Sequence, residues 1–260
     1  RIDIFEGEKF IIERINIVGN SVTNDSVIRG EMIVDEGDPY SALLIKKSIN
    51  KLKARNIFGK VEKKITEGSS PDLKVLEISV EEKATGEIMA GAGIGTDGTS
   101  FMASVSENNW LGRGINFQSA LNVSEEKISG NIAVTNPNYN FSGNAVTTGL
   151  DVSSTDRTAT TGYESTRTGF NLSTSFEQYE DVYFSPSLSA YYESLETNSS
   201  ATKKLKSQEG TYYDTDFSYS IIKDKRDQVF QTTDGYRGSF NQKLPLYSKN
   251  PSILKIGQNN

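Results

Sequence analysis

Apolar and polar residues alternate in short segments from about residue 86 onward, and no stretch there has helical periodicity. In one segment, Val146, Leu150 and Val152 alternate with Asp151 and Ser153. A period of two residues indicates a β-strand with one apolar and one polar face. We predict nine strands, at residues 87–95, 100–108, 114–124, 128–136, 144–154, 165–176, 182–193, 212–222 and 235–246, and the start of a tenth near Ile253.

The residues before position 85 have a mixed pattern that includes three further strands. We predict these strands at residues 9–18, 60–67 and 73–82, where β-branched residues are frequent. In the first of them, the face that we expect to be buried consists of Ile11, Ile15 and Ile17. In the third, it consists of Leu76, Ile78 and Val80.

Two helices are predicted between the first and second of these strands. A short one over residues 24–32 would have Thr23 as its N-cap. For the second, Asp38 fits an N-cap and Pro39 the first helical position, and the helix would run to about Asn56. Its apolar face is Ile45, Ile49 and Leu52. The predicted order is therefore β-α-α-β-β.

Composition excludes several classes of function. The net charge of -6 and the pI of about 5.0 argue against nucleic-acid binding, which needs a clustered basic face. The basic residues at 201–206 are predicted to be a solvated loop. The sequence contains no Cys and no His, and no carboxylate pair lies in an apolar setting. We therefore predict a protein without metal or cofactor that is not an enzyme.

The alternating strands fit either of two architectures. No apolar run approaches the ~20 residues of a membrane-spanning helix, and the mean hydropathy is -0.49. In a transmembrane strand the apolar and polar residues alternate, so its mean hydropathy is low. A strand of a water-soluble β-sandwich alternates in the same way, so the pattern alone does not separate the two architectures. The long polar connection at 194–211, at the end opposite residues 109–113, favours the barrel, because such barrels have short turns at one end and longer loops at the other.

Aromatic residues collect at one end of the predicted sheet. If the first strand runs away from the α/β domain, the connections after the second, fourth, sixth and eighth strands lie on the domain's side. These connections hold Trp110, Tyr139, Phe141, Tyr179 and Phe230, whereas those at the far end hold only Tyr163. Trp and Tyr favour membrane-water interfaces, so we predict a periplasmic rim of aromatics. Hydrophobic plugs at the base of a soluble barrel are the alternative.

Several segments, in order along the chain, resemble the BamA family of outer-membrane protein assembly factors, which have POTRA domains followed by a barrel. They are "IVGNSVTNDSVIRGEM" (17–32), "EGDPYS" (36–41), "VEEKATGEIMAGAGIGTDG" (80–98), "VSENNWLGRG" (105–114), "VTNPNY" (134–139) and "DGYRGSF" (234–240). The resemblance implies an α+β POTRA domain at 1–84, the last of several, and the N-terminal half of an antiparallel transmembrane β-barrel at 85–260. About nine to ten of about sixteen strands would be present, so we expect a fragment of a longer protein.

The resemblance also implies a function for the first barrel strand. In this family it acts as a lateral gate, to which strands of client proteins add by main-chain hydrogen bonding. Gly91 and Gly93 weaken a strand, although glycines that only bend the strand are the alternative. The predicted gate residues are Ile88, Met89, Ala90, Gly91, Ala92, Gly93 and Ile94. The acidic segment at 80–83 is either a hinge to the barrel or a solvated charge run.

From the resemblance, the expected function is folding and insertion of β-barrel proteins in the outer membrane of Gram-negative bacteria, with the POTRA domain in the periplasm. The expected partners are nascent outer-membrane β-barrel proteins, accessory assembly lipoproteins and the lipid bilayer, with no nucleic acid. The main alternative is a two-partner-type secretion transporter that moves a polypeptide through the barrel. A hydrolase barrel and a passive porin are less consistent with the missing His and with the POTRA-like domain, respectively.

Overall fold

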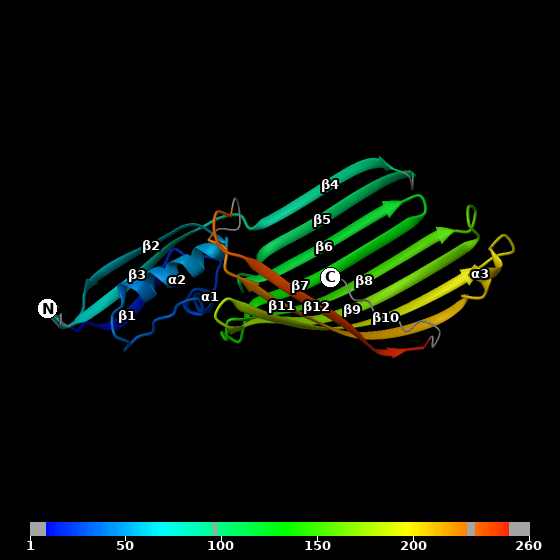
Figure 1. The fold of residues 1–260 in the computed structure, drawn as a ribbon. Helices are drawn as coiled ribbons and strands as arrows, with labels where there is room; N and C mark the ends of the chain where they lie inside the picture. Colours follow the sequence, from blue (N-terminus) through cyan, green and yellow to red (C-terminus); the bar gives the residue numbers. More distant parts are fainter. Residues whose placement is uncertain (1–8, 96–97, 228–231, 250–260) are drawn as a thin grey trace. The chain divides into compact units, whose positions relative to one another are not determined.

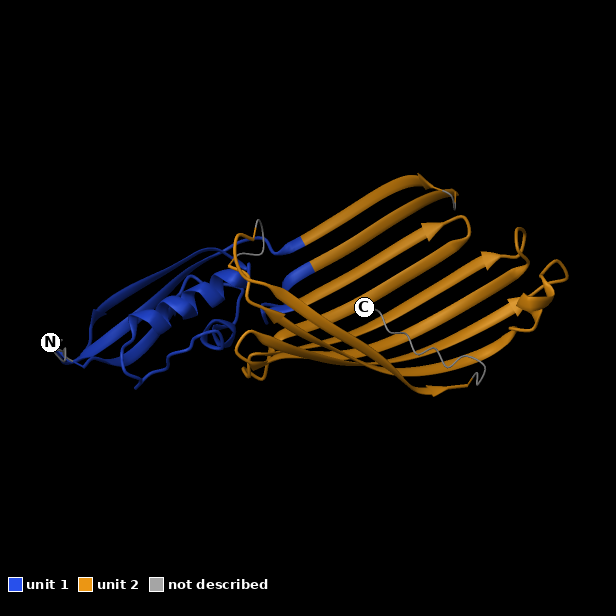
Figure 2. Cartoon of the chain, in the orientation of Figure 1, with its two compact units in different colours: residues 1–86, 107–115 blue, residues 87–106, 116–260 orange. Residues whose placement is uncertain are grey.

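The computed structural model describes residues 9–95, 98–227 and 232–249. Two compact units are described separately: unit 1 comprises residues 1–86 and 107–115, and unit 2 comprises residues 87–106 and 116–260 (Figure 2). Unit 1 thus contains the segment 107–115, of which the sequence pattern placed residues 109–113 between two strands of the large sheet. The tenth strand predicted near Ile253 lies outside the described residues.

Unit 1 has a three-stranded sheet and two helices in the predicted β-α-α-β-β order (Figure 1). β1 (Ile11–Val18) pairs in parallel with β3 (Leu73–Glu82), and β2 (Phe58–Glu67) pairs antiparallel with the other side of β3. The helices α1 (Asp25–Arg29) and α2 (Ala42–Ala54) connect β1 to β2. The central strand is therefore β3, after which the chain continues into the large sheet.

The hydrophobic core of unit 1 joins α2 to the sheet. The predicted apolar faces of α2 and β3 both belong to it. Its members are Ile12, Ile15, Ile28, Val34, Ile45, Ile49, Leu52, Ile57, Phe58, Val61, Leu76, Ile78 and Val80. Full burial of such a side chain contributes about 1.5–3 kcal/mol, so this cluster is the main source of stability in unit 1.

The buried face of β1 differs from the predicted one. Ile12 and Ile15 are buried, whereas Ile11 is exposed and Ile17 packs at the margin of the core. The register between β1 and β3 shifts between Ile12 and Arg14. A bulge of this kind inserts one residue and changes which side chains face the core, whereas the prediction assumed an unbroken period of two.

Both predicted helix N-caps are wrong. The N-cap of α1 is Asn24 rather than Thr23. The N-cap of α2 is Ser41 rather than Asp38, and Pro39 therefore lies outside the helix. The Ser41 hydroxyl accepts a hydrogen bond from an amide of the first turn at 3.4 Å. Ser, Thr, Asp and Asn are all suitable N-caps, so contacts elsewhere in the fold decide which of them is used.

Unit 2 contains a sheet of nine strands, each beside its neighbours in sequence (Figure 1). The strands are β4 (Gly86–Gly95), β5 (Gly98–Trp110), β6 (Ile115–Ser124), β7 (Lys127–Tyr139), β8 (Asn144–Arg157), β9 (Tyr163–Tyr179), β10 (Val182–Thr197), β11 (Gly210–Asp224) and β12 (Arg237–Ser248). Pairing from β6 to β12 is antiparallel. All nine predicted strands are confirmed, and within the described residues β4 and β12 form the two edges.

Several strands extend beyond their predicted ends. β9 has 17 residues, because its ladder with β10 continues past Phe176 through Glu177 to Tyr179, with an irregularity at Gln178, where alternation no longer marks a strand. The connection predicted at 194–211 is correspondingly shorter. The basic residues predicted to be a solvated loop form a short helix there, α3 (Lys203–Lys206), with the Thr202 hydroxyl as its cap.

The two faces of the large sheet differ in polarity, as the alternation predicted. Directly paired residues of an antiparallel sheet share a face. One row of cross-strand partners is mostly apolar: Phe117, Val134, Thr148, Leu172, Leu188, Phe217 and Leu244. The row beside it on the opposite face is polar: Asn116, Thr135, Thr147, Ser173, Ser187, Ser218 and Lys243. Among the helices described, none is long and apolar enough to span a membrane.

Candidate functional site

Strand β4 is an edge strand, and β5 is its neighbour in the described sheet. All residues of β4 are exposed to solvent, and the exposed fraction is 81% for Ile88 and 89% for Ile94. An edge strand presents unpaired backbone N–H and C=O groups along its free side. The predicted gate residues Ile88 to Ile94 all lie on this strand, so another strand has both the room and the backbone groups to pair with it.

Neither crowding nor unusual backbone geometry requires glycine in the middle of β4. A Cβ atom at Gly91 would have no atom within 4 Å, and one at Gly93 would make an ordinary contact of 3.5 Å with the Ser100 hydroxyl. Neither residue is among the glycines with positive φ. Glycine in a strand costs about 0.5–1 kcal/mol relative to alanine and has no side chain to pack. These glycines therefore weaken β4 without a steric reason.

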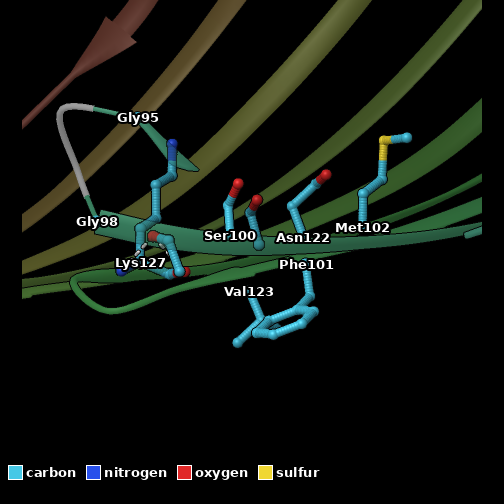
Figure 3. A pocket seen from close by; sticks show the side chains of 10 residues that line it. Gly95, Gly98, Ser100, Phe101, Met102, Asn122, Val123 and Lys127 are labelled. Atoms are coloured by element: carbon cyan, nitrogen blue, oxygen red, sulfur yellow. Dashed lines mark hydrogen bonds between the residues drawn. The ribbon is translucent and has the colours of Figure 1, made fainter. Parts of the chain in front are cut away.

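A hollow of about 350 Å³ lies near the β4–β5 connection (Figure 3). Figure 3 shows Ser100 and Asn122 on one side of the strands, and Phe101 and Val123 on the other. The polar groups that line the hollow are serine hydroxyls, the Asn122 amide and the Lys127 ammonium. In the part of the chain that the structure describes, no three His, Cys, Asp or Glu residues are grouped to hold a metal ion. The hollow can offer hydrogen bonds, but it has no acid-base pair.

The predicted rim aromatics lie mostly at strand ends rather than inside turns. Trp110, Tyr139 and Tyr179 are the last residues of β5, β7 and β9. Phe141 lies in the turn after β7, with a φ of 57°, and Phe230 lies outside the described residues. Alternate strands of such a sheet run in the same direction, so their last residues share one end. The four described side chains are exposed.

The β5–β6 turn, defined as residues 107–115, is built into unit 1. Asn109 is 8% exposed and Thr23 is 3% exposed. The Asn109 amide nitrogen donates to Thr23 Oγ1 at 2.8 Å, and its amide oxygen accepts from the Gly114 backbone N–H at 2.8 Å. The Asn24 backbone N–H donates to the Gly112 carbonyl at 2.8 Å. Loss of one partner from such a buried pair costs about 1–3 kcal/mol.

Gly112 is fixed by both its backbone conformation and the space around it. Its φ is 68°, in the left-handed region that favours glycine. A Cβ atom there would lie 2.0 Å from the carbonyl oxygen of Val22. The turn therefore lies too close to the 19–24 loop, defined as residues 19–24 after β1, for a side chain at position 112.

Glu82, the last residue of β3, holds the same loop from the other side. Its carboxylate accepts hydrogen bonds from the backbone amides of Ser21 at 3.0 Å, Val22 at 2.9 Å and Thr23 at 2.6 Å, and from the Ser21 hydroxyl at 2.6 Å. Burial raises the pKa of Glu82, but the hydrogen bonds from Ser21, Thr23 and Val22 outweigh it and lower the pKa to about 2. For Glu82, the interpretation of 80–83 as a solvated charge run is therefore wrong.

Arg55 supplies a further attachment to the turn. Its Nε lies 3.6 Å from the Glu31 carboxylate, with both side chains largely buried, and its Nη2 donates to the Gly114 carbonyl. Burial lowers the pKa of Arg55, and the nearby Glu31 charge acts in the opposite direction. The carbonyl and the carboxylate together compensate a cation that is costly to bury.

Sequence reasoning singled out Trp110 and missed its neighbour Asn109. It also assigned Thr23 to a helix cap, whereas the Thr23 hydroxyl accepts from Asn109. A polar residue followed by two glycines in a tight turn was a usable signal for a braced turn. Nothing in the local pattern indicated a partner that lies 86 positions away in the sequence.

Two family models match the chain. The Omp85 superfamily domain matches residues 109–259, and the POTRA model, described as a surface antigen variable number repeat, matches residues 10–83. The outer membrane protein assembly factor BamA of Neisseria meningitidis is 28% identical over 138 residues, which are 52% of this chain and 17% of that protein. BamA of Nitratidesulfovibrio vulgaris is 27% identical over 139 residues, or 51% of this chain and 17% of that protein.

Solved structures share the fold. BamA from Haemophilus ducreyi lacking POTRA domains 1-3 superposes with a TM-score of 0.73 at 21% identity, covering 92% of this chain and 49% of that chain. CdiB from Acinetobacter baumannii gives a TM-score of 0.55 at 10% identity, covering 92% of this chain and 46% of that chain. The chain therefore spans about half the length of these structures, and the matched regions are less than a fifth of the curated relatives.

We predict that Glu82→Gln destabilises unit 1 at pH 7 and that the effect fades in acid. A carboxylate whose pKa is depressed on folding contributes stability above its unfolded pKa of ~4.3, and loses it as the pH falls toward the folded value, which is about 2 for Glu82. Loss of about 1 kcal/mol lowers the Tm of a domain this size by about 4–8 °C. Thermal unfolding followed by the helical circular dichroism signal from pH 7 to pH 2 measures it.

The matched control is Glu81→Gln, which changes the neighbouring exposed carboxylate of β3. It should lower the Tm by much less at every pH. A Tm difference between Glu82→Gln and the unchanged protein that stays constant from pH 7 to pH 2 would contradict the role assigned to this carboxylate.

Proposed function

The chain belongs to the Omp85 superfamily, and we propose that it is part of an outer-membrane protein assembly factor of the BamA type. In this proposal, residues 1–84 are a periplasmic POTRA domain, the last of several. Residues 85–260 are the N-terminal half of a barrel that has about sixteen strands when complete and lies in the outer membrane. The POTRA match over residues 10–83 and the two-faced sheet support this assignment.

The observation that carries the proposal is the glycine-weakened first strand of the large sheet, β4, where no crowding requires Gly91 or Gly93. In lipid, every backbone N–H and C=O group must be paired within the protein, because no water can replace the partner. A barrel therefore pairs its first strand with its last, and a weak first strand lowers the cost of opening that seam. The open edge then accepts a client strand by β-augmentation, in which main-chain hydrogen bonds supply the affinity.

The proposed partners follow from the same arrangement. Nascent outer-membrane β-barrel proteins supply the strand that pairs with residues 88–94, and the bilayer surrounds the apolar face of the sheet. The sheet edges of unit 1 offer similar backbone groups to accessory assembly lipoproteins in the periplasm. The proposed role requires no catalysis, metal or cofactor, because strand addition makes hydrogen bonds only.

A two-partner-type secretion transporter is the second candidate. The polar row that includes Thr135, Ser173 and Ser218 favours it, because small hydroxyl side chains would line a pore through which an extended polypeptide could pass. A transporter makes no use of a weak edge at β4. The two candidates therefore differ in which residues of the sheet a transported or inserted polypeptide contacts.

Site-specific cross-linking distinguishes the two candidates. Single cysteines are placed from Ile88 to Ile94, at Ser187 and Ser218 on the polar face, and at the control positions Val146 and Leu150 of β8. The sequence has no cysteine of its own in this region. A client protein with a cysteine in its C-terminal strand is trapped during assembly. We expect disulfides at positions of β4 at least about tenfold above the β8 controls, as pairing of defined register requires.

Capture at Ser187 and Ser218 without capture on β4 would instead favour the transporter. Equal capture at β4 and at Val146 or Leu150 would contradict the gate.

The rim proposal is tested with Trp110, the only tryptophan in this sequence. An indole at the membrane interface is quenched by lipids brominated near the headgroup more strongly than by lipids brominated near the chain ends. The difference spectrum between the protein and its Trp110→Phe variant isolates this residue. We expect stronger quenching by the shallow label. Absence of quenching by either lipid would place Trp110 away from the interface and contradict the rim.

A further inference from the structure

The β5–β6 turn and the 19–24 loop interlock through backbone and buried side chains. Asn109 uses both ends of its amide, donating to Thr23 and accepting from Gly114, each at 2.8 Å. The Asn24 N–H donates to the Gly112 carbonyl at 2.8 Å. One buried side chain therefore sets the shape of the turn and its attachment to the loop at the same time.

The 19–24 loop has little freedom to follow the turn by deforming. On its other side, the Glu82 carboxylate binds the amides of residues 21–23. At the start of the loop, Gly19 has a φ of 91°, and a Cβ atom there would lie 2.0 Å from the Val80 carbonyl oxygen. The loop is therefore fixed to β3, so a displacement of the turn must be transmitted to the sheet of unit 1.

The same turn gathers the ends of three strands of the large sheet. The Thr85 hydroxyl, just before β4, donates to the Glu107 carboxylate, and the Asn108 N–H donates to the Thr85 carbonyl at 3.3 Å. Arg55 donates to the carbonyl of Gly114, just before β6. Thr85, the last residues of β5 and Gly114 thus all belong to one network of contacts inside unit 1.

We infer that the β5–β6 turn is a clamp inside unit 1: it binds the 19–24 loop, so that a displacement of the loop displaces residues 107–115 and a displacement of residues 107–115 displaces the loop. The surface of the 19–24 loop is covered by the chain's own segment 107–115. Asn109 and Thr23 are positioning residues in this clamp. The inference goes beyond the proposed assembly function and holds independently of it, because it concerns contacts within this chain alone.

Hydrogen exchange across the clamp tests the coupling in the membrane-inserted full-length protein. Thr23→Val keeps the shape of the side chain but removes the oxygen that accepts from Asn109, whereas Thr23→Ser keeps it. Thr23→Val should speed exchange of amides in residues 107–115 by about tenfold, as expected for loss of one buried hydrogen bond. Thr23→Ser should leave their exchange close to that of the unchanged protein.

Coupling must also act in the reverse direction. Asn109→Ala should speed exchange of the Asn24 amide by a similar factor, whereas Asn108→Ala, at the neighbouring asparagine, should not. Gly112→Ala should act like Asn109→Ala. Gly143→Ala is its matched control, because Gly143 also has a positive φ, 77°, but no atom within 4 Å of a Cβ.

Peptides from α2 report whether unit 1 stays folded, and their protection should be unchanged in every variant. Two outcomes would overturn the clamp. One is faster exchange confined to the mutated segment, with the opposite segment unaffected. The other is equal behaviour of Thr23→Val and Thr23→Ser, or of Asn109→Ala and Asn108→Ala. No client protein takes part, so failure of the proposed gate would leave the exchange results unchanged.

Discussion

The structure depends on one constraint: lipid offers no hydrogen-bond partners, so the backbone N–H and C=O groups of a membrane strand must be paired within the protein. A strand in lipid must pair on both sides, and the seven inner strands of the described sheet do so with their neighbours in sequence. Of these nine strands, only β4 and β12 have a free side within the described residues. The proposed function uses the free side of β4, because either another strand of the barrel or a client strand can pair with its backbone.

Strand β4 is weakly held by its side chains, whereas the clamp beside its first residue is held by buried hydrogen bonds. Gly91 and Gly93 reduce the packing of β4 and raise the conformational entropy that the chain loses when this strand forms, and no crowding requires them. Gly112, in contrast, is required by a close backbone approach. In the proposed mechanism, the seam can open because β4 is weak, while the attachment of Thr85 to the turn keeps the start of the strand in place.

Much of this fold could be predicted from the sequence, because a period of two residues directly reports a strand with two different faces. All nine strands of the large sheet were located in this way, and so was the buried face of β3. Strand ends were less predictable, since the ladder of β9 continues through Glu177 to Tyr179 although residues 177 and 178 are both polar and show no alternation. The bulge in β1 had no sequence signal, so Ile11 was wrongly placed in the core.

The clamp could not be predicted, because local patterns do not specify partners distant in sequence. Thr23 fits an N-cap on local grounds alone, but the fold uses its hydroxyl to bind Asn109. Glu82 similarly resembles one member of an exposed acidic run until the amides of residues 21–23 are brought to it. The glycines of β4 are visible in the sequence, but the interpretation of this strand as a gate came from the family resemblance and stays a proposal.

The central claim, that main-chain hydrogen bonds to β4 bind a client strand, is tested most directly with N-methylated peptides. N–H groups of a strand point alternately to its two sides, so methylation of one alternate set removes the donors facing β4 and methylation of the other set does not. Each lost hydrogen bond is worth about 0.5–1.5 kcal/mol. The account predicts that the affinity of a client's C-terminal strand peptide falls at least about tenfold for one methylated set only. Equal affinities of the two methylated peptides would contradict it.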